Sequence, residues 1–153
     1  MVMKTKNLVI KLIILLLIPL MGFKKDKCNS DVLYAQVVSK LKKFSVLKDY
    51  RIYSKKKKKL TPEEYEYFTI PLNRGVTYKF HAISNPDMAG KLVINLYNNP
   101  EKEFMFATTL SQGTGNLRES IEFKCQSTGN FLVGYYFLGG EEGCGVAVSA
   151  FQQ

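Results

Sequence analysis

The chain has 153 residues, of which 46% are hydrophobic and 12% aromatic, and this composition excludes a disordered protein. The length fits one domain with one hydrophobic core. The formal net charge is +9 at pH 7, and one histidine with three widely spaced cysteines gives no pattern typical of a zinc site.

Residues 1–22 have the layout of a secretory signal peptide. Lys4, Lys6 and Lys11 precede an apolar run over residues 12–23, LIILLLIPLMGF. As a helix this run is roughly 18 Å long, and a membrane span needs about 20 apolar residues. We therefore expect an exported protein, either periplasmic, outer-membrane-associated or extracellular, with no transmembrane span in the mature chain. The alternatives are an uncleaved anchor and a lipid on Cys28, which four charged residues separate from the apolar run.

The next segment, residues 23–45, is expected to contain one amphipathic helix over residues 31–44. Its apolar side chains recur every three or four residues, which is typical of a helix with one buried face: Leu33, Val37, Leu41 and Phe44. Docking on a sheet is the interpretation that we favour, and a helix lying on a membrane surface is the alternative.

Residues 46–153 form the expected β-sandwich domain. After the helix the apolar period changes from about 3.6 to about 2, as expected for strands. Turn-rich stretches separate eight candidate strands, over residues 46–54, 65–70, 76–83, 91–97, 104–110, 120–125, 131–138 and 144–151. The predicted fold class is therefore mainly β, an antiparallel jelly-roll-like β-sandwich of about eight strands with one N-terminal amphipathic helix.

Alternation along the strands assigns the cysteines to a face. Cys125 is in phase with the apolar Phe123, and Cys144 is in phase with Val146, so both cysteines are expected to point inward. We predict a disulfide between Cys125 and Cys144, because disulfides persist in exported proteins. A bridge between Cys28 and Cys144 is the next alternative. Either bridge leaves one of the three cysteines unpaired within the chain.

The charge is unevenly distributed along the chain. Residues 24–59 include 13 basic and 3 acidic residues, whereas residues 60–153 include 6 basic and 10 acidic ones. Five of the basic residues are consecutive: Lys55, Lys56, Lys57, Lys58 and Lys59. Alternation would turn some of these side chains inward, so we expect the run in an exposed edge or loop. There it either discourages pairing between the sheets of neighbouring molecules or contacts an anionic surface or polymer.

Three segments resemble the bacterial pre-peptidase C-terminal (PPC) domain: YFTIPLNRGVTYKF, KLVINLYNN and IEFKCQSTGNFLVGYYF. The matching features are an apolar strand at 68–71, Gly75, Tyr-x-Phe at 78–80, Leu-Tyr at 96–97 and Thr-Gly-x-Phe at 128–131. This resemblance, over about residues 65–151, implies a non-catalytic jelly-roll-like sandwich that serves exported enzymes as an accessory or binding module. The preceding helix and the lysine run depart from the family. The chain is also similar to small exported proteins of Gram-negative bacteria.

The sequence contains no recognisable catalytic constellation, so we expect no enzyme, cofactor or metal. His81 shares a strand face with Lys79 and is expected to be exposed, and a small hydrolase that uses this histidine is the least favoured hypothesis. Glu141 and Glu142 are adjacent in a glycine-rich loop, where a solvated turn is favoured over a calcium site.

The expected function is that of an exported, non-catalytic accessory or interaction module in the cell envelope. Its partner would be an envelope protein or a glycan, not a nucleic acid. The alternative is a module that binds carbohydrate or an anionic polymer. Five aromatic residues are candidates for stacking on a sugar, although core packing is favoured for them: Tyr65, Tyr67, Tyr135, Tyr136 and Phe137.

Overall fold

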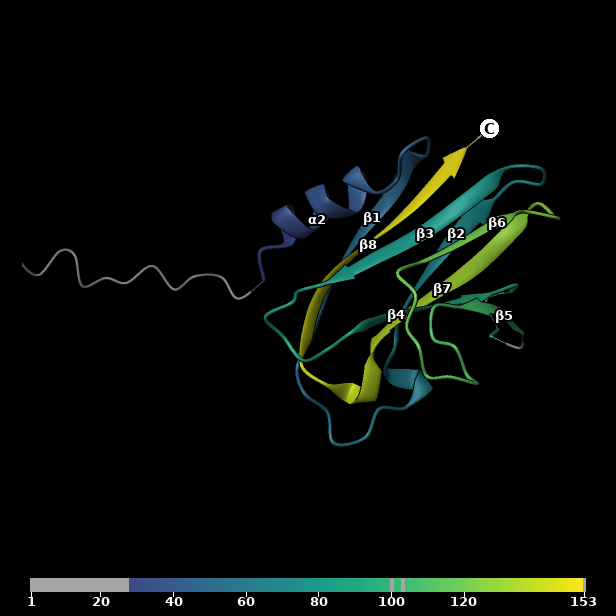
Figure 1. Ribbon diagram of the computed structural model, residues 1–153. Helices are drawn as coiled ribbons and strands as arrows, with labels where there is room; N and C mark the ends of the chain where they lie inside the picture. Colours follow the sequence, from purple (N-terminus) through teal and green to yellow (C-terminus); the bar gives the residue numbers. More distant parts are fainter. Residues whose placement is uncertain (1–27, 100, 103, 153) are drawn as a thin grey trace, which may run out of the picture.

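Two four-stranded antiparallel sheets face each other in the computed structural model, which describes residues 28–99, 101–102 and 104–152 (Figure 1). The first sheet has the order β1-β8-β3-β6 and the second the order β2-β7-β4-β5. We call them sheet A and sheet B. The elements in chain order are α2 (Ser30–Ser39), β1 (Ser45–Ser54), the short helix η2 (Pro62–Glu64), β2 (Glu66–Leu72), β3 (Thr77–Ser84), β4 (Leu92–Tyr97), β5 (Met105–Thr108), β6 (Ser120–Lys124), β7 (Gly129–Phe137), the short helix η3 (Leu138–Gly140) and β8 (Gly143–Gln152).

The predicted fold class is confirmed, and the eight observed strands correspond one to one with the predicted ones. The helix is shorter than predicted. It ends at Ser39, and the chain then turns through Lys42, whose φ of 54° lies in the left-handed region. The predicted signal peptide, residues 1–22, lies outside the described residues. No helix in the described part of the chain is long and apolar enough to cross a membrane.

The interior of the sandwich is filled by side chains from both sheets. Sheet A contributes Tyr50, Ile52 and Phe80, and sheet B contributes Ile94 and Val133, and all five are at most 3% exposed. This pattern follows from the alternation of side chains along each strand, which places every second residue on the inner face.

A second core lies on the outer face of sheet A, beneath α2. The predicted helical stripe is buried there against β8 and comprises Leu33, Val37, Leu41 and Phe44. Asn29 caps the helix, since its side chain accepts a hydrogen bond from the backbone N–H of Val32 at 3.4 Å. The helix lies outside the sandwich and packs mainly on β8 and β3 (Figure 1). Docking of the helix on a sheet, rather than on a membrane surface, is thus what the structure shows.

The predicted Cys125–Cys144 disulfide is wrong, and the alternative bridge is the one present. Cys144 is bonded to Cys28, with the two Cα atoms 5.8 Å apart, and Cys125 is a free, buried cysteine. The physical reason is that Cys125 and Cys144 lie in different cores. Cys125 packs in the interior of the sandwich, whereas Cys144 faces the helix.

Truncation of Leu41 tests the second core. Leu41 is 2% exposed, so Leu41→Ala should lower the free energy of unfolding by about 2–5 kcal/mol through lost burial and a residual cavity. Leu47→Ala is the matched control, because Leu47 is 45% exposed and should change stability little. Urea unfolding measures both, and equal effects of the two variants would contradict the packing described.

Candidate functional site: the lysine segment and its surroundings

The lysine segment, residues 55–59, lies in the connection between β1 and η2 and forms no strand. The side chains of neighbouring lysines point to different partners. Lys56 Nζ lies 3.0 Å from a carboxylate oxygen of Glu141, and Lys57 Nζ lies 3.1 Å from one of Glu64. The backbone N–H of Lys57 donates to the carbonyl of Gly140 at 2.8 Å, which fixes the segment against η3. A hollow lies on each side of this fixed point.

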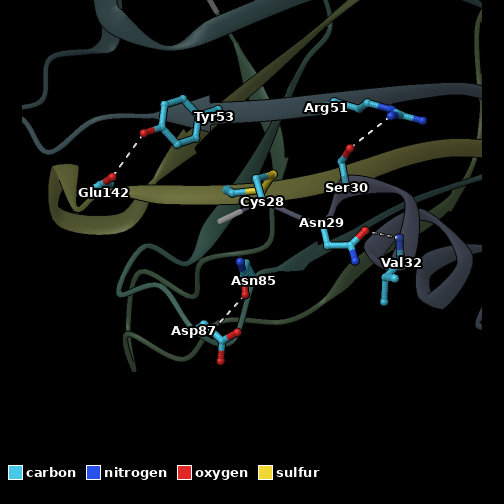
Figure 2. The surroundings of a disulfide bond; sticks show 10 residues. Cys28, Asn29, Ser30, Val32, Arg51, Tyr53, Asn85, Asp87 and Glu142 are labelled. Carbon is cyan, nitrogen blue, oxygen red and sulfur yellow. Dashed lines mark hydrogen bonds between the residues drawn. A yellow bond between two sulfur atoms is a disulfide. The ribbon is translucent and has the colours of Figure 1, made fainter. Parts of the chain in front are cut away.

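The larger hollow, which we call the groove, has a volume of about 670 Å³ and lies beside the disulfide. One wall is the start of α2, and the other is formed by the loop between β3 and β4 with the acidic turn before β8. It is lined by Asn29, Val32, Leu33, Gln36, Lys56, Asn85, Pro86, Asp87, Met88, Ala89, Glu141 and Glu142. Figure 2 shows how these walls surround the bridge.

Cys144 holds both walls of the groove in place. Its sulfur is bonded to Cys28, which directly precedes the helix cap, and its carbonyl accepts a hydrogen bond from the backbone N–H of Asn85 at 2.7 Å. The Asn85 side chain in turn accepts one from the N–H of Asp87 at 2.9 Å (Figure 2). The groove is therefore a preformed surface, and its shape depends on the disulfide.

The groove combines apolar and acidic groups. Val32 is 48% exposed and contributes an apolar side chain to the lining. Of the two adjacent glutamates for which a solvated turn was favoured over a calcium site, Glu141 pairs with Lys56 and Glu142 accepts a hydrogen bond from the Tyr53 hydroxyl at 3.2 Å. Among the described residues, no group of three or more potential metal ligands is present.

The smaller hollow, which we call the cavity, has a volume of about 410 Å³ and lies on the other side of the lysine segment. Tyr136 and Phe137 line it together with two lysines and two glutamates: Lys55, Lys57, Glu64 and Glu66. Tyr135 also lines it. The hydroxyl of Tyr135 is buried and has no hydrogen-bond partner among the described residues.

Four tyrosines gather on the outer face of sheet B, which no helix of the described chain covers. We call them the tyrosine face: Tyr65, Tyr67, Tyr97 and Tyr136. The Tyr65 and Tyr136 rings are stacked, with centroids 4.1 Å apart. Tyr67 and Tyr97 lie over Gly134, where an added Cβ would come within 2.8 Å of the Tyr67 ring. Burial raises the pKa of Tyr136 to about 12 and also raises that of Tyr67, so both hydroxyls stay protonated at neutral pH.

This face was predicted in part from the sequence. Tyr65, Tyr67 and Tyr136 were candidates and lie together, whereas Tyr135 and Phe137 point into the sandwich. Tyr97 was missed. The strand register would have identified Tyr97. Asn95 and Tyr97 both lie on the outward face of β4, where they pair with Gly134 and Leu132 of β7.

His81 is buried, which corrects the expectation of an exposed strand histidine. It is 4% exposed beneath the end of the helix, and neither ring nitrogen has a hydrogen-bond partner among the described residues. The closest charge is the Glu119 carboxylate, 3.9 Å from Nε2, which also pairs with Lys40 at 2.7 Å. Burial is the main cause that lowers the pKa of His81. The Glu119 carboxylate opposes this decrease, and the charges of Lys40 and Lys79 add to it.

No family model and no curated protein matches the chain. The resemblance to the PPC domain therefore stays a prediction. Among solved structures, the chain is similar to PliG of Aeromonas hydrophila, a periplasmic lysozyme inhibitor of g-type lysozyme, with 11% identity and a TM-score of 0.45. The match covers 69% of this chain and 83% of that one. At this level of likeness no function is transferred.

His81 predicts acid sensitivity of the folded state. Its folded pKa is below the unfolded value of 6.5, so the unfolded chain binds more protons and stability falls as the pH drops below about 6.5. The decrease is at most about 1.4 kcal/mol per pH unit for one group. We expect His81→Leu to remove this part of the pH dependence between about pH 7.5 and 5 in urea unfolding. Parallel stability curves for the two proteins would exclude His81 as the cause.

Proposed function

We propose that this protein is an exported, non-catalytic interaction module of the cell envelope whose groove receives a segment of a partner protein. The groove carries this proposal, because its volume of about 670 Å³ is within the range of binding sites and its walls are held in place covalently. A preformed surface loses little conformational entropy on binding. Export is supported by the disulfide together with the apolar run at residues 12–23.

The charges of the groove indicate the partner's chemistry. Asp87, Glu141 and Glu142 line it against a single lysine, Lys56, which already pairs with Glu141. Val32 and Met88 supply apolar surface beside these carboxylates. The complementary segment therefore carries a Lys or Arg next to an apolar side chain.

A non-catalytic role is supported by the position of the single histidine. His81 lies beneath the helix, and it is not among the residues that line the groove or the cavity. Its hydrolytic use would need a nucleophile within hydrogen-bond reach, and neither ring nitrogen has a hydrogen-bond partner among the described residues.

Site-specific photo-crosslinking tests the groove. A photoreactive residue at position 36 should form an adduct with one envelope protein, which purified wild-type protein should compete away, whereas position 126 should form none. The charge reversals Asp87→Lys and Glu142→Lys together should abolish the adduct, and Glu101→Lys, a reversal outside the groove, should not. Cys28→Ser should weaken the adduct, because it frees the helical wall.

Equal adducts from positions 36 and 126, or an adduct that survives the double reversal, would show that the groove is not the binding surface. Each variant is first shown to unfold cooperatively, so that loss of binding is separated from loss of fold.

The second candidate function is contact with an anionic surface through the lysine segment. Within the described part of the chain, Lys55, Lys58 and Lys59 make no ion pair, and all three are exposed. Lys56 and Lys57 are partly neutralised by their glutamate partners. Three lysines are thus available to an anionic lipid or polymer.

A matched pair of variants tests this contact. Replacing Lys55, Lys58 and Lys59 with Gln should reduce binding to vesicles containing phosphatidylglycerol by roughly 1 kcal/mol per lysine. Replacing Lys56 and Lys57 with Gln should reduce it less, because their charges are compensated. Co-sedimentation at low and high salt measures both, and binding should weaken with salt. If the wild type and the triple variant sediment equally at low salt, the segment serves only solubility.

A further inference from the structure

We propose that the tyrosine face, together with the adjoining cavity, is a binding site for a neutral oligosaccharide. This inference does not depend on the groove, which lies on the other side of the lysine segment. Three observations carry it: an aromatic face on the outer side of sheet B, a hollow that shares Tyr136 with this face, and balanced charge in that hollow.

The aromatic rings lie on the outer face of sheet B rather than in a core, and the Lys102 ammonium lies 3.7 Å from the centroid of the Tyr67 ring. Tyr65, Tyr67 and Tyr136 are each half-buried, and Tyr97 is 8% exposed beneath them. In contrast, the outer face of sheet A is covered by the helix. Half-buried tyrosines present a flat apolar ring and a polar hydroxyl together, and a sugar ring needs both, since it has C–H faces and a hydroxyl rim.

The packing beneath these rings fixes them in place. Gly134 leaves room for the Tyr67 ring to lie close to the sheet, since a Cβ there would come within 2.8 Å of it. The Tyr67 hydroxyl donates a hydrogen bond to the carbonyl of Pro62 at 2.9 Å, and the Tyr65 and Tyr136 rings are inclined by only 10°. A platform that is rigid before binding loses little entropy when a ligand stacks on it.

The cavity adds depth at one end of the platform. Its volume of about 410 Å³ is within the range of small-ligand sites, and Tyr136 belongs both to its lining and to the tyrosine face. On the side of the lysine segment the cavity is bounded by Lys57 and Gly140, whose backbone N–H and carbonyl form a hydrogen bond. One sugar unit in this hollow would leave the following units over the tyrosines.

The charge balance favours a neutral sugar over a polyanion. Lys55 and Lys57 line the cavity with Glu64 and Glu66, so two ammonium groups face two carboxylates. Ammonium groups only donate hydrogen bonds and ionised carboxylates only accept them, whereas each sugar hydroxyl does both. A polyanion would meet like charge at both glutamates.

Isothermal titration calorimetry with chitotriose, maltotriose and cellotriose, and with polygalacturonate as the polyanion, tests the proposal on the whole mature protein. We expect at least one neutral trisaccharide to bind. Tyr65→Ala should weaken its binding by about tenfold or more, and Tyr65→Phe, which keeps the ring, should retain it. Glu66→Gln should also weaken it.

Two controls separate this site from the others. Asp87→Lys, in the groove, and Lys58→Gln, outside the cavity, should leave trisaccharide affinity unchanged. On the wild-type protein, chemical-shift changes on titration should concentrate at the four tyrosines and the cavity, so the result does not rely on a variant that unfolds. The proposal is overturned if none of the neutral sugars binds, if only polygalacturonate binds, or if the shifts map elsewhere.

Discussion

Burial of β8 on both faces is the constraint on which the rest of this structure depends. All residues of the strand from Gly143 to Ala150 are buried. One face closes the interior of the sandwich and the other is covered by α2, and the strand pairs with β1 on one side and β3 on the other. A Cβ at Gly145 would come within 2.9 Å of the Ile83 carbonyl, so the strand is as closely packed at its start as in its middle.

This constraint determines where binding surfaces can form. The helix protects the outer face of sheet A, and the groove on that side lies at the helix start, where Asn29 and the β3–β4 loop meet. The outer face of sheet B carries tyrosines instead, with Lys102 over the Tyr67 ring, and Val93 and Leu132 on this face are buried. The two sides of the sandwich therefore differ in chemistry, one acidic and partly apolar, the other aromatic.

The same constraint explains what the sequence predicted and what it did not. Period-2 alternation was enough to identify the eight strands, and helical spacing identified the stripe from Leu33 to Phe44. Alternation divides a strand into two faces, but it does not say which face is inner when both are apolar. In β8 both faces are apolar and buried, so Cys144 was assigned to the wrong one, and with it the disulfide.

His81 was misplaced for a different reason, namely that alternation does not show when a polar strand face is covered by a helix. The side of β3 that carries Lys79 and His81 has the polarity of a solvent face, yet the helix covers it. For the lysine segment an exposed edge or loop was predicted, because strand alternation would have turned some of its side chains inward, and the segment lies in a loop. The groove and the cavity were not predicted, because their linings join residues far apart in sequence, such as Asn29 and Glu142.

The bridge between Cys28 and Cys144 also bears on how the molecule would survive proteolysis. The five consecutive lysines are exposed or half-exposed sites for a trypsin-like enzyme in a segment without strand pairing. A cut there separates α2 and β1 from the rest of the polypeptide. The bridge still joins the two fragments, and nine residue pairs of the β1–β8 ladder still align them. A nicked molecule would therefore keep both walls of its groove, while its cavity would lose the tether that closes it.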